Sequence, residues 1–133
     1  MLTTLLVYKE YVSFSDFVST LEQEYNNKVL STDSEKKALQ LIKKHPFDIV
    51  IIDEELSDMT GLHFINKLVK VNPLINCAVV SSLPEKDFHE ESEGLGVLMQ
   101  LPVKPQKKDA EMLMQKLRKI KSLINYQTKG DAD

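Results

Sequence analysis

The stretch FDIVIIDEELSDMTG, residues 47–61, ends an apolar run on a carboxylate, Asp53, and places a glycine, Gly61, eight residues later. An isolated loop aspartate more often caps a helix or faces water. A carboxylate at the tip of an all-apolar strand is instead aimed by that strand toward the crevice at the edge of the sheet. Asp53 is therefore predicted to be a residue of a functional crevice. Gly61 is predicted to let the loop turn tightly beneath it. Glu54 and Glu55 are interpreted as solvated loop charges.

Polar side chains follow three other apolar runs. Lys9 and Glu10 follow TTLLVY, Ser81 and Ser82 end INCAVVSS, and Lys104 comes shortly after VLMQL. In open parallel sheets the functional crevice lies beyond the carboxyl ends of the strands, at the switch in strand order. If these runs are parallel strands, their polar ends should converge on that crevice.

Strand-like and helix-like patterns alternate along the chain. Strands are predicted at residues 3–8, 28–31, 48–52, 75–82 and 97–101. Helices are predicted at residues 13–25, 32–46, 62–72 and 107–126, with a weak acidic helix or loop at 83–96. Ser13 with Asp16 reads as a capping box for the first helix. The polar residues 32–34, Thr, Asp and Ser, are predicted to cap the second helix. Five strands alternating with five helical segments predict an α/β fold with a parallel sheet covered by helices on both faces.

The composition excludes several classes of protein. A chain of 133 residues is about one domain. The 17 basic residues nearly balance the 20 acidic ones, so no basic excess indicates nucleic acid. The apolar runs are far shorter than the ~20 residues that span a bilayer. Cys77 is the one cysteine, which excludes an internal disulfide and fits a reducing, cytoplasmic setting. The three histidines are scattered without metal-ligand spacing, and no nucleophile elbow is present.

The sequence DIVIIDEELSDMTGLHFI, followed by VVSS and VKP, resembles the receiver domain of two-component response regulators. The resemblance covers about residues 3–121 and implies a flavodoxin-like (βα)5 fold, a three-layer sandwich with a five-stranded parallel sheet. It implies that Asp53 is the phosphoacceptor. It also implies that Ser81 and Lys104 hold the phosphoryl oxygens.

The resemblance also implies partners and organisation. A sensor histidine kinase or a phosphotransfer protein would supply the phosphoryl group, and a downstream effector protein or domain would read the result. No membrane or direct nucleic-acid contact is expected, and the chain is expected to act as a signalling module rather than an enzyme. Residues 1–126 are expected to form the receiver-like domain and residues 127–133 a frayed polar C-terminal tail.

Family members usually carry two acidic residues after the first strand, which help to bind Mg2+. Here that pair is Lys9 and Glu10, so the Mg2+ ligands would be Glu10, Asp53 and the backbone carbonyl of Glu55. With Lys104 also present, the net charge of the crevice is expected to be near zero. Each lost or reversed charge within ~4–6 Å is worth on the order of 1–4 kcal/mol. Mg2+ is therefore a doubtful cofactor. The affinity of this crevice for Mg2+ is expected to be lower by orders of magnitude than that of the usual crevice with two acidic residues.

Two arrangements of Lys9 are possible. In the first, its ammonium pairs with Asp53 and stands in for the metal, which leaves a receiver that is not phosphorylated efficiently. In the second, Lys9 points outward, Glu10, Asp53 and the backbone carbonyl of Glu55 still hold Mg2+, and Asp53 is phosphorylated at a lower rate. The alternative function is a phosphorylation-independent pseudo-receiver, a protein–protein interaction module whose state is set by partner binding. A further departure is Leu101, which occupies a position where the family often has an aromatic residue that moves on phosphorylation. A flavin-binding protein is disfavoured because YKEYVSF is bulky and charged.

Overall fold

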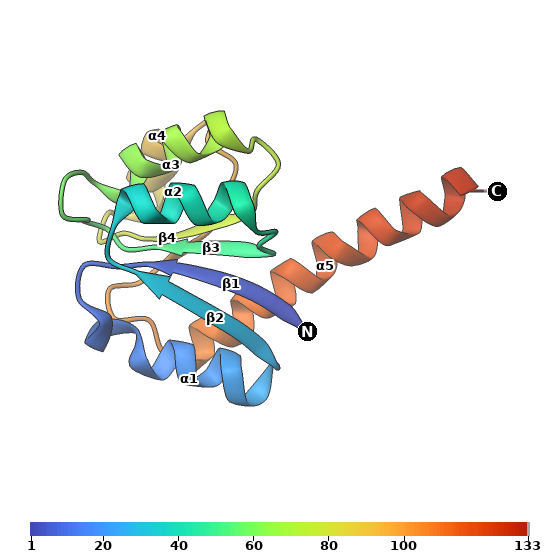
Figure 1. Ribbon diagram of the computed structural model, residues 1–133, viewed down its shortest axis with the longest axis horizontal. Coiled ribbons are helices and arrows are strands. Elements are labelled where there is room, and N and C mark those ends of the chain that lie inside the picture. The colour runs from blue at the N-terminus through green and yellow to red at the C-terminus, as the bar shows by residue number, and fades with distance from the viewer. Residues whose placement is uncertain (133) are drawn as a thin grey trace.

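The computed structural model describes the backbone of residues 1–132 and the side chains of residues 1–123. Strands and helices alternate along the chain (Figure 1). The strands are β1 (Leu2–Val7), β2 (Asn27–Thr32), β3 (Ile49–Ile52), β4 (Cys77–Val80) and β5 (Val97–Leu101). The helices are the 3-10 helix η1 (Tyr11–Phe14), then α1 (Ser15–Glu24), α2 (Glu35–Lys44), α3 (Gly61–Val71), α4 (Glu85–Ser92) and α5 (Lys107–Ala132).

The five strands form one parallel sheet in the order β2-β1-β3-β4-β5. Every residue of β3 and β4 is buried, as expected for parallel strands covered on both faces. The strand order reverses between β1 and β3 because the chain first winds outward to β2 and then returns past β1. The predicted α/β architecture, a three-layer sandwich around a five-stranded parallel sheet, is confirmed.

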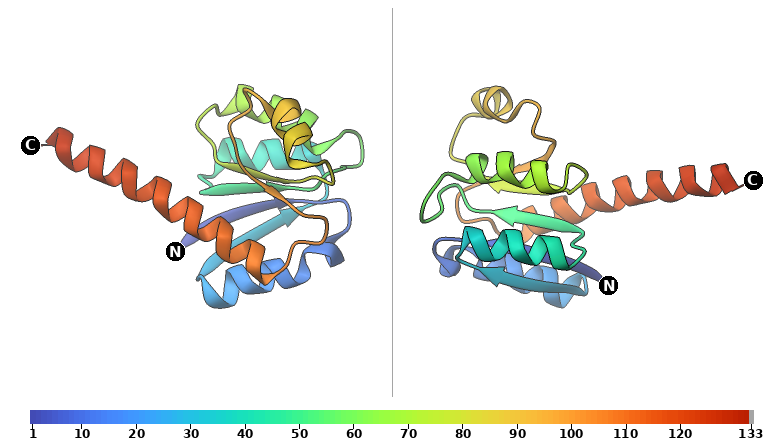
Figure 2. Two further views of the ribbon diagram at one scale, coloured as in Figure 1. Left: turned by 180° about the vertical axis from the view of Figure 1, so that it is seen from behind. Right: turned by 45° about the horizontal axis from the view of Figure 1, so that its top comes forward.

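Two apolar cores lie on opposite faces of the sheet. Helices α2, α3 and α4 cover one face, and α1 and α5 cover the other (Figure 2). On the first face the largest completely buried side chain is Phe64 of α3. On the second face Phe14 and Phe17 pack against the buried residues of α5. These two cores leave the carboxyl ends of the strands uncovered, so the loops there are free to form a site.

The helix starts were predicted with mixed success. Ser34 caps α2 by accepting a hydrogen bond from the backbone N–H of Lys37, which confirms the predicted cap. The capping box at Ser13 is wrong. Ser13 lies inside the 3-10 helix η1, and α1 begins two residues later at Ser15 without a side-chain cap. The extra turn of 3-10 helix therefore removes Ser13 from the position at which its hydroxyl could cap α1.

Helix α5 extends well beyond the sheet (Figure 1). Its first half is buried through Ala110, Leu113 and Leu117, whereas Leu123 is 58% exposed. The backbone of α5 is helical as far as Ala132, and the division into a domain up to residue 126 and a polar tail after it stays a prediction.

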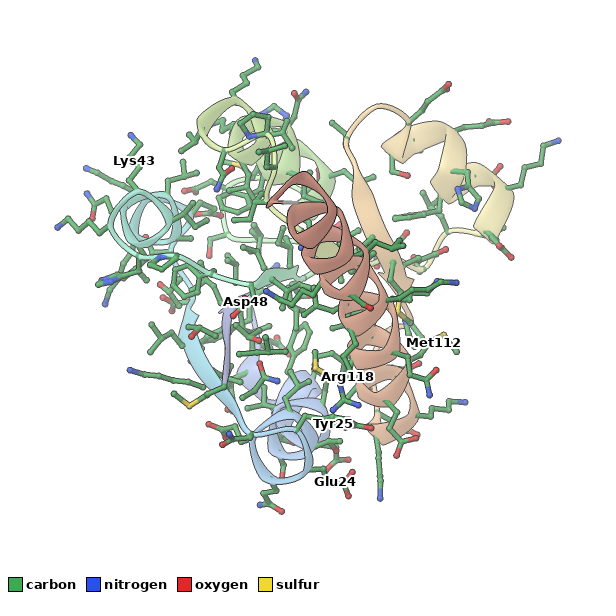
Figure 3. The ribbon with its side chains drawn as sticks, turned by 90° about the vertical axis from the view of Figure 1, so that its right-hand side faces the viewer. Glu24, Tyr25, Lys43, Asp48, Met112 and Arg118 are labelled. Carbon is green, nitrogen blue, oxygen red and sulfur yellow. The ribbon has the colours of Figure 1, made fainter. Side chains whose placement is uncertain are left out.

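Two ion pairs and a cation–π contact help to hold α5 to the body of the molecule. Lys107 at its start forms an ion pair of 2.9 Å with Glu24 at the end of α1. The guanidinium of Arg118 lies 5.2 Å from the ring centre of Tyr25 (Figure 3), a favourable cation–π contact. Further along, the ammonium of Lys121 lies 2.6 Å from Oδ1 of Asp48, just before β3. The last of these contacts joins α5 to the residue that precedes β3.

We expect Asp48→Asn to lower the free energy of unfolding by about 1 kcal/mol at neutral pH. The two side chains are 25% (Asp48) and 40% (Lys121) exposed, so solvent screens the pair in part. Burial alone would raise the pKa of Asp48. Its hydrogen bonds with Lys121 and the backbone N–H of Thr3 outweigh burial, so the pKa lies below the ordinary value of 3.8.

A carboxyl group with a lowered pKa stabilises the fold above its ordinary pKa, and this contribution is lost as the pH falls through the lowered pKa. The stability difference between wild type and Asp48→Asn should therefore shrink as the pH falls below 3.8. Urea unfolding at a series of pH values measures this difference. Asp33→Asn, a change at an exposed aspartate, is the control. A difference that stays constant down to acid pH would contradict the ion pair.

Candidate functional site

Asp53 directly follows β3 at the point where the strand order reverses. Its backbone N–H donates to the carbonyl oxygen of Val7 (2.9 Å), which extends the pairing of β3 with β1. Its side chain is half-buried. Oδ1 accepts a hydrogen bond from the backbone N–H of Glu54 (2.8 Å), and Oδ2 accepts one from the backbone N–H of Lys9 (3.2 Å). Two backbone donors thus fix the orientation of the carboxylate.

The environment of Asp53 disfavours its ionised form. Burial is the largest influence and raises the pKa of Asp53. The hydrogen bonds from backbone amides lower the pKa, and the nearby carboxylate of Glu54 raises it again. The net effect is a pKa above the ordinary value of 3.8.

The sequence places two lysines, Lys9 and Lys104, in the crevice around Asp53. Among the described side chains, no ammonium lies within 4.0 Å of the Asp53 carboxylate. Lys9 is exposed and contributes only its backbone N–H, so the outward arrangement is the one observed. Lys104 has a φ of 55° and lines a hollow of about 230 Å³ beside Val12 and Asp16. The near-zero net charge expected for the crevice stays a prediction.

Ser81 is buried at the end of β4. Its backbone N–H donates to the carbonyl oxygen of Leu101 (3.0 Å) and so extends the β4–β5 pairing. Its hydroxyl oxygen accepts a hydrogen bond from the backbone N–H of Leu83 (3.1 Å). In this state the hydroxyl of Ser81 supports a turn, and its contact with a phosphoryl oxygen stays a prediction.

Sequence reasoning missed the role of Glu54, which was interpreted as a solvated loop charge. Oε2 of Glu54 accepts hydrogen bonds from both the backbone N–H (2.6 Å) and the hydroxyl (2.8 Å) of Ser82. These two contacts join the β3–α3 loop to the β4–α4 loop. The two residues are 28 positions apart, so no local sequence signal pairs them. Glu55 is exposed, as interpreted, and is joined to Thr60 by an antiparallel bridge.

Gln100 is a second residue that the sequence did not single out. Its Nε2 donates to the carbonyl oxygens of Ser81 (3.2 Å) and Leu83 (2.8 Å). The β4–α4 loop is therefore held from the β5 side as well as by Glu54. The next residue, Leu101, is completely buried in the core between the sheet and α5.

The β3–α3 loop is closed by contacts around Gly61. The N–H of Gly61 donates to the carbonyl oxygen of Glu54 (2.8 Å). A Cβ atom on Gly61 would overlap the carbonyl oxygen of Asp53. Glycine is required by this close approach and not by an unusual φ, as its φ is not positive. From α2, Oε1 of the buried Glu35 accepts a hydrogen bond from the backbone N–H of Asp58 (3.0 Å) and steadies the same loop.

The residues around Asp53 do not fit a resident Mg2+ ion well. Within residues 1–123, no three or more side chains of His, Cys, Asp or Glu are grouped so that they could hold a metal. Glu10 is exposed, and Lys9 stands where a second acid would be needed. Cys77 adds no chemistry to the site, since burial raises the pKa of its thiol to about 12.

The geometry described above can be compared with known proteins. Residues 5–118 match the family model of the response regulator receiver domain. The chain belongs to this family. It is a receiver domain of two-component signalling, and the residues matched include all five strands except the start of β1.

Solved receiver structures share the fold at low sequence identity. The chemotaxis response regulator CheY4 of Vibrio cholerae is 18% identical, with a TM-score of 0.76 over 88% of this chain and 98% of that chain. A response regulator receiver domain from Clostridium thermocellum is 17% identical, with a TM-score of 0.77 over 92% and 99% of the two chains. A CheY-like receiver domain from Methylobacillus flagellatus is 21% identical, with a TM-score of 0.75 over 88% and 98%. A search of curated proteins gives no significant match.

Within the described residues, no helix combines the length and the apolar character that crossing a bilayer requires.

Proposed function

We propose that this receiver domain signals through protein–protein contact and that Asp53 accepts a phosphoryl group, but slowly. The observation that carries the proposal is the state of Asp53. Its carboxylate is aimed by two backbone amides at the carboxyl end of β3, but no ammonium is paired with it among the described side chains. The nucleophile is positioned, whereas the positive charge that phosphoryl transfer requires is not.

The transfer itself would form one bond and break one bond. An oxygen of the Asp53 carboxylate attacks the phosphorus of a phosphohistidine or a small acyl phosphate. The bond from phosphorus to the donor breaks, and the donor keeps its electron pair. The amides of Glu54 and Lys9 orient the attacking group. Because the equatorial oxygens gain no paired cation from this chain in the observed state, the barrier stays high.

The partners in this proposal are those of the family. A sensor histidine kinase or a phosphotransfer protein in the cytoplasm would donate the phosphoryl group, and an effector protein or domain would bind the receiver. In this proposal the chain turns over no substrate and is not an enzyme, and Mg2+ has at most a weak site at Glu10, Asp53 and the carbonyl of Glu55.

A phosphorylation-independent pseudo-receiver is the second candidate. Two observations favour it: Lys9 in place of an acid, and the carboxylate of Glu54, which already occupies the donors of Ser82. In this case partner binding alone would set the state of the domain.

Intact-mass measurement after incubation with acetyl phosphate separates the two candidates. We expect a slow, partial addition of one phosphoryl mass, with an increase of less than about tenfold when Mg2+ is added. Asp53→Asn should abolish the addition. Asp58→Asn, at an exposed carboxylate of the same loop, should keep it. If no phosphoryl group is added at any time, the pseudo-receiver is the candidate that remains. If phosphorylation is rapid, complete and dependent on Mg2+, the proposal of an incomplete cation site is wrong.

A further inference from the structure

A carboxylate joins two loops at the edge of the sheet where Asp53 lies. Glu54 directly follows Asp53, and Ser82 lies beyond the end of the neighbouring strand, since β3 and β4 pair side by side. Oε2 of Glu54 accepts both the backbone N–H (2.6 Å) and the hydroxyl (2.8 Å) of Ser82. We call these two contacts the Glu54–Ser82 clasp. It is the one side-chain link between the β3–α3 and β4–α4 loops among the described hydrogen bonds.

The donors in the clasp suit an anionic oxygen. A backbone N–H and a hydroxyl that converge on one negative oxygen form charge-assisted hydrogen bonds, which are stronger than neutral ones. A phosphoryl group on Asp53 would place negatively charged oxygens at the same sheet edge. In the unmodified protein, Glu54 already supplies such an oxygen to Ser82. The β4–α4 loop is therefore already bound to an anionic oxygen, that of Glu54, when Asp53 is not phosphorylated.

The opposite side of the loop is held by neutral contacts. Gln100 donates from its amide to the carbonyl oxygens of Ser81 and Leu83. These bonds involve no charged group. The Glu54–Ser82 clasp is consequently the part of the loop's support that another anion can replace.

The loop also sets the start of α4. This helix has eight residues, of which only Phe88 and Ser92 are buried. It begins at Glu85, two residues after Leu83. With so small a buried face, α4 takes much of its position from the loop that precedes it, so a change at Ser82 should be felt along α4.

We propose that Glu54 is an internal anion that holds the β4–α4 loop closed in place of a phosphoryl group on Asp53. Release of Ser82 by Glu54 is then the conformational step that changes the position of α4. The role of α4 as the surface that responds rests on the proposed function, whereas the clasp can be tested in the unphosphorylated protein.

Amide hydrogen exchange, measured by NMR on the full unphosphorylated chain, tests the clasp. In Glu54→Ala, the amides of Ser82 and Leu83 should exchange about tenfold faster, which corresponds to the loss of a charge-assisted hydrogen bond. Glu54→Gln keeps an acceptor but loses the charge, so its effect should be smaller. Glu90→Ala removes an exposed carboxylate from α4 and should leave these two amides unchanged.

A second variant guards against a folding defect. Ser82→Ala keeps the backbone donor and removes the hydroxyl, and it should give a smaller acceleration with the rest of the amide spectrum unchanged. Unchanged exchange at Ser82 in Glu54→Ala, with the fold intact, would overturn the proposal. Equal acceleration in Glu90→Ala would overturn it as well.

Acetyl phosphate treatment of the same variants separates this inference from the proposed function. If Glu54 occupies donors that a phosphoryl group needs, Glu54→Ala should become phosphorylated several-fold faster than wild type. Faster amide exchange without any phosphorylation would support the clasp and remove the phosphoacceptor role. Normal phosphorylation with unchanged exchange would keep that role and overturn the clasp.

Discussion

Gly61→Ala is expected to lower the free energy of unfolding by about 3 kcal/mol. The added Cβ would overlap the carbonyl oxygen of Asp53 and press on the side chains of Ile52 and Val79. The two apolar neighbours belong to β3 and β4, and the carbonyl is backbone, so no flexible side chain can move aside. The start of α3 would have to shift away from the sheet instead, and the turn between Glu54 and Gly61 would open.

Chemical denaturation of Gly61→Ala and wild type measures the loss. Asn66→Ala places the same side chain on the exposed face of α3 and should change the stability by less than about 0.5 kcal/mol. Because the displaced group is the carbonyl of Asp53, Gly61→Ala should also slow the reaction with acetyl phosphate. A variant as stable as wild type would show that the β3–α3 loop is looser than described.

Leu101→Ala should cost about 2–5 kcal/mol of unfolding free energy. Leu101 is completely buried at the end of β5 and packs in the core beside Ala110 and Leu113 of α5. Its removal leaves a cavity between the sheet and α5, and the surrounding backbone is fixed by the β4–β5 pairing at Ser81. Two destabilising free energies add together: the lost transfer free energy of the removed atoms, and the cost of the cavity that they leave.

Thermal and urea unfolding of Leu101→Ala test this expectation. Val103→Ala is the control, because Val103 lies two residues away but is 55% exposed, so its truncation should cost less than about 0.5 kcal/mol. Equal losses in the two variants would contradict the placement of Leu101 in the core.

The sequence predicted the fold because its signals are local. Residues 97–101 were predicted as a strand and form β5 with the same bounds. The polar start at Ser34 was predicted to cap a helix and does so. In each case the signal, an apolar strand pattern or a capping side chain, depends only on residues a few positions apart. Ser13 failed because the competing 3-10 turn at Tyr11 satisfies the same short segment in another way.

The candidate site was predicted in its position but less well in its contacts. The placement of Asp53 at the end of β3 follows from strand alternation alone. The link between Glu54 and Ser82 depends on how two loops approach each other in space. No hydrophobic periodicity or local motif in the sequence reports such an approach. The absence of an ion pair at Asp53 among the described side chains has a related reason. A charge count gives the number of ammonium groups in the crevice, whereas their positions depend on the backbone of separate loops, such as the one at Lys104, where φ is 55°.

The ion pair between Lys121 and Asp48 has a mechanical consequence. Beyond Lys121, the backbone of α5 continues for eleven residues to Ala132, which at about 1.5 Å per residue is a lever of about 17 Å. If α5 tilts by about 10° at Lys121, its C-terminal end moves by about 3 Å, which is comparable to the length of a hydrogen bond. A small rearrangement around Asp48 would thus cause a larger displacement at the C-terminal end of α5.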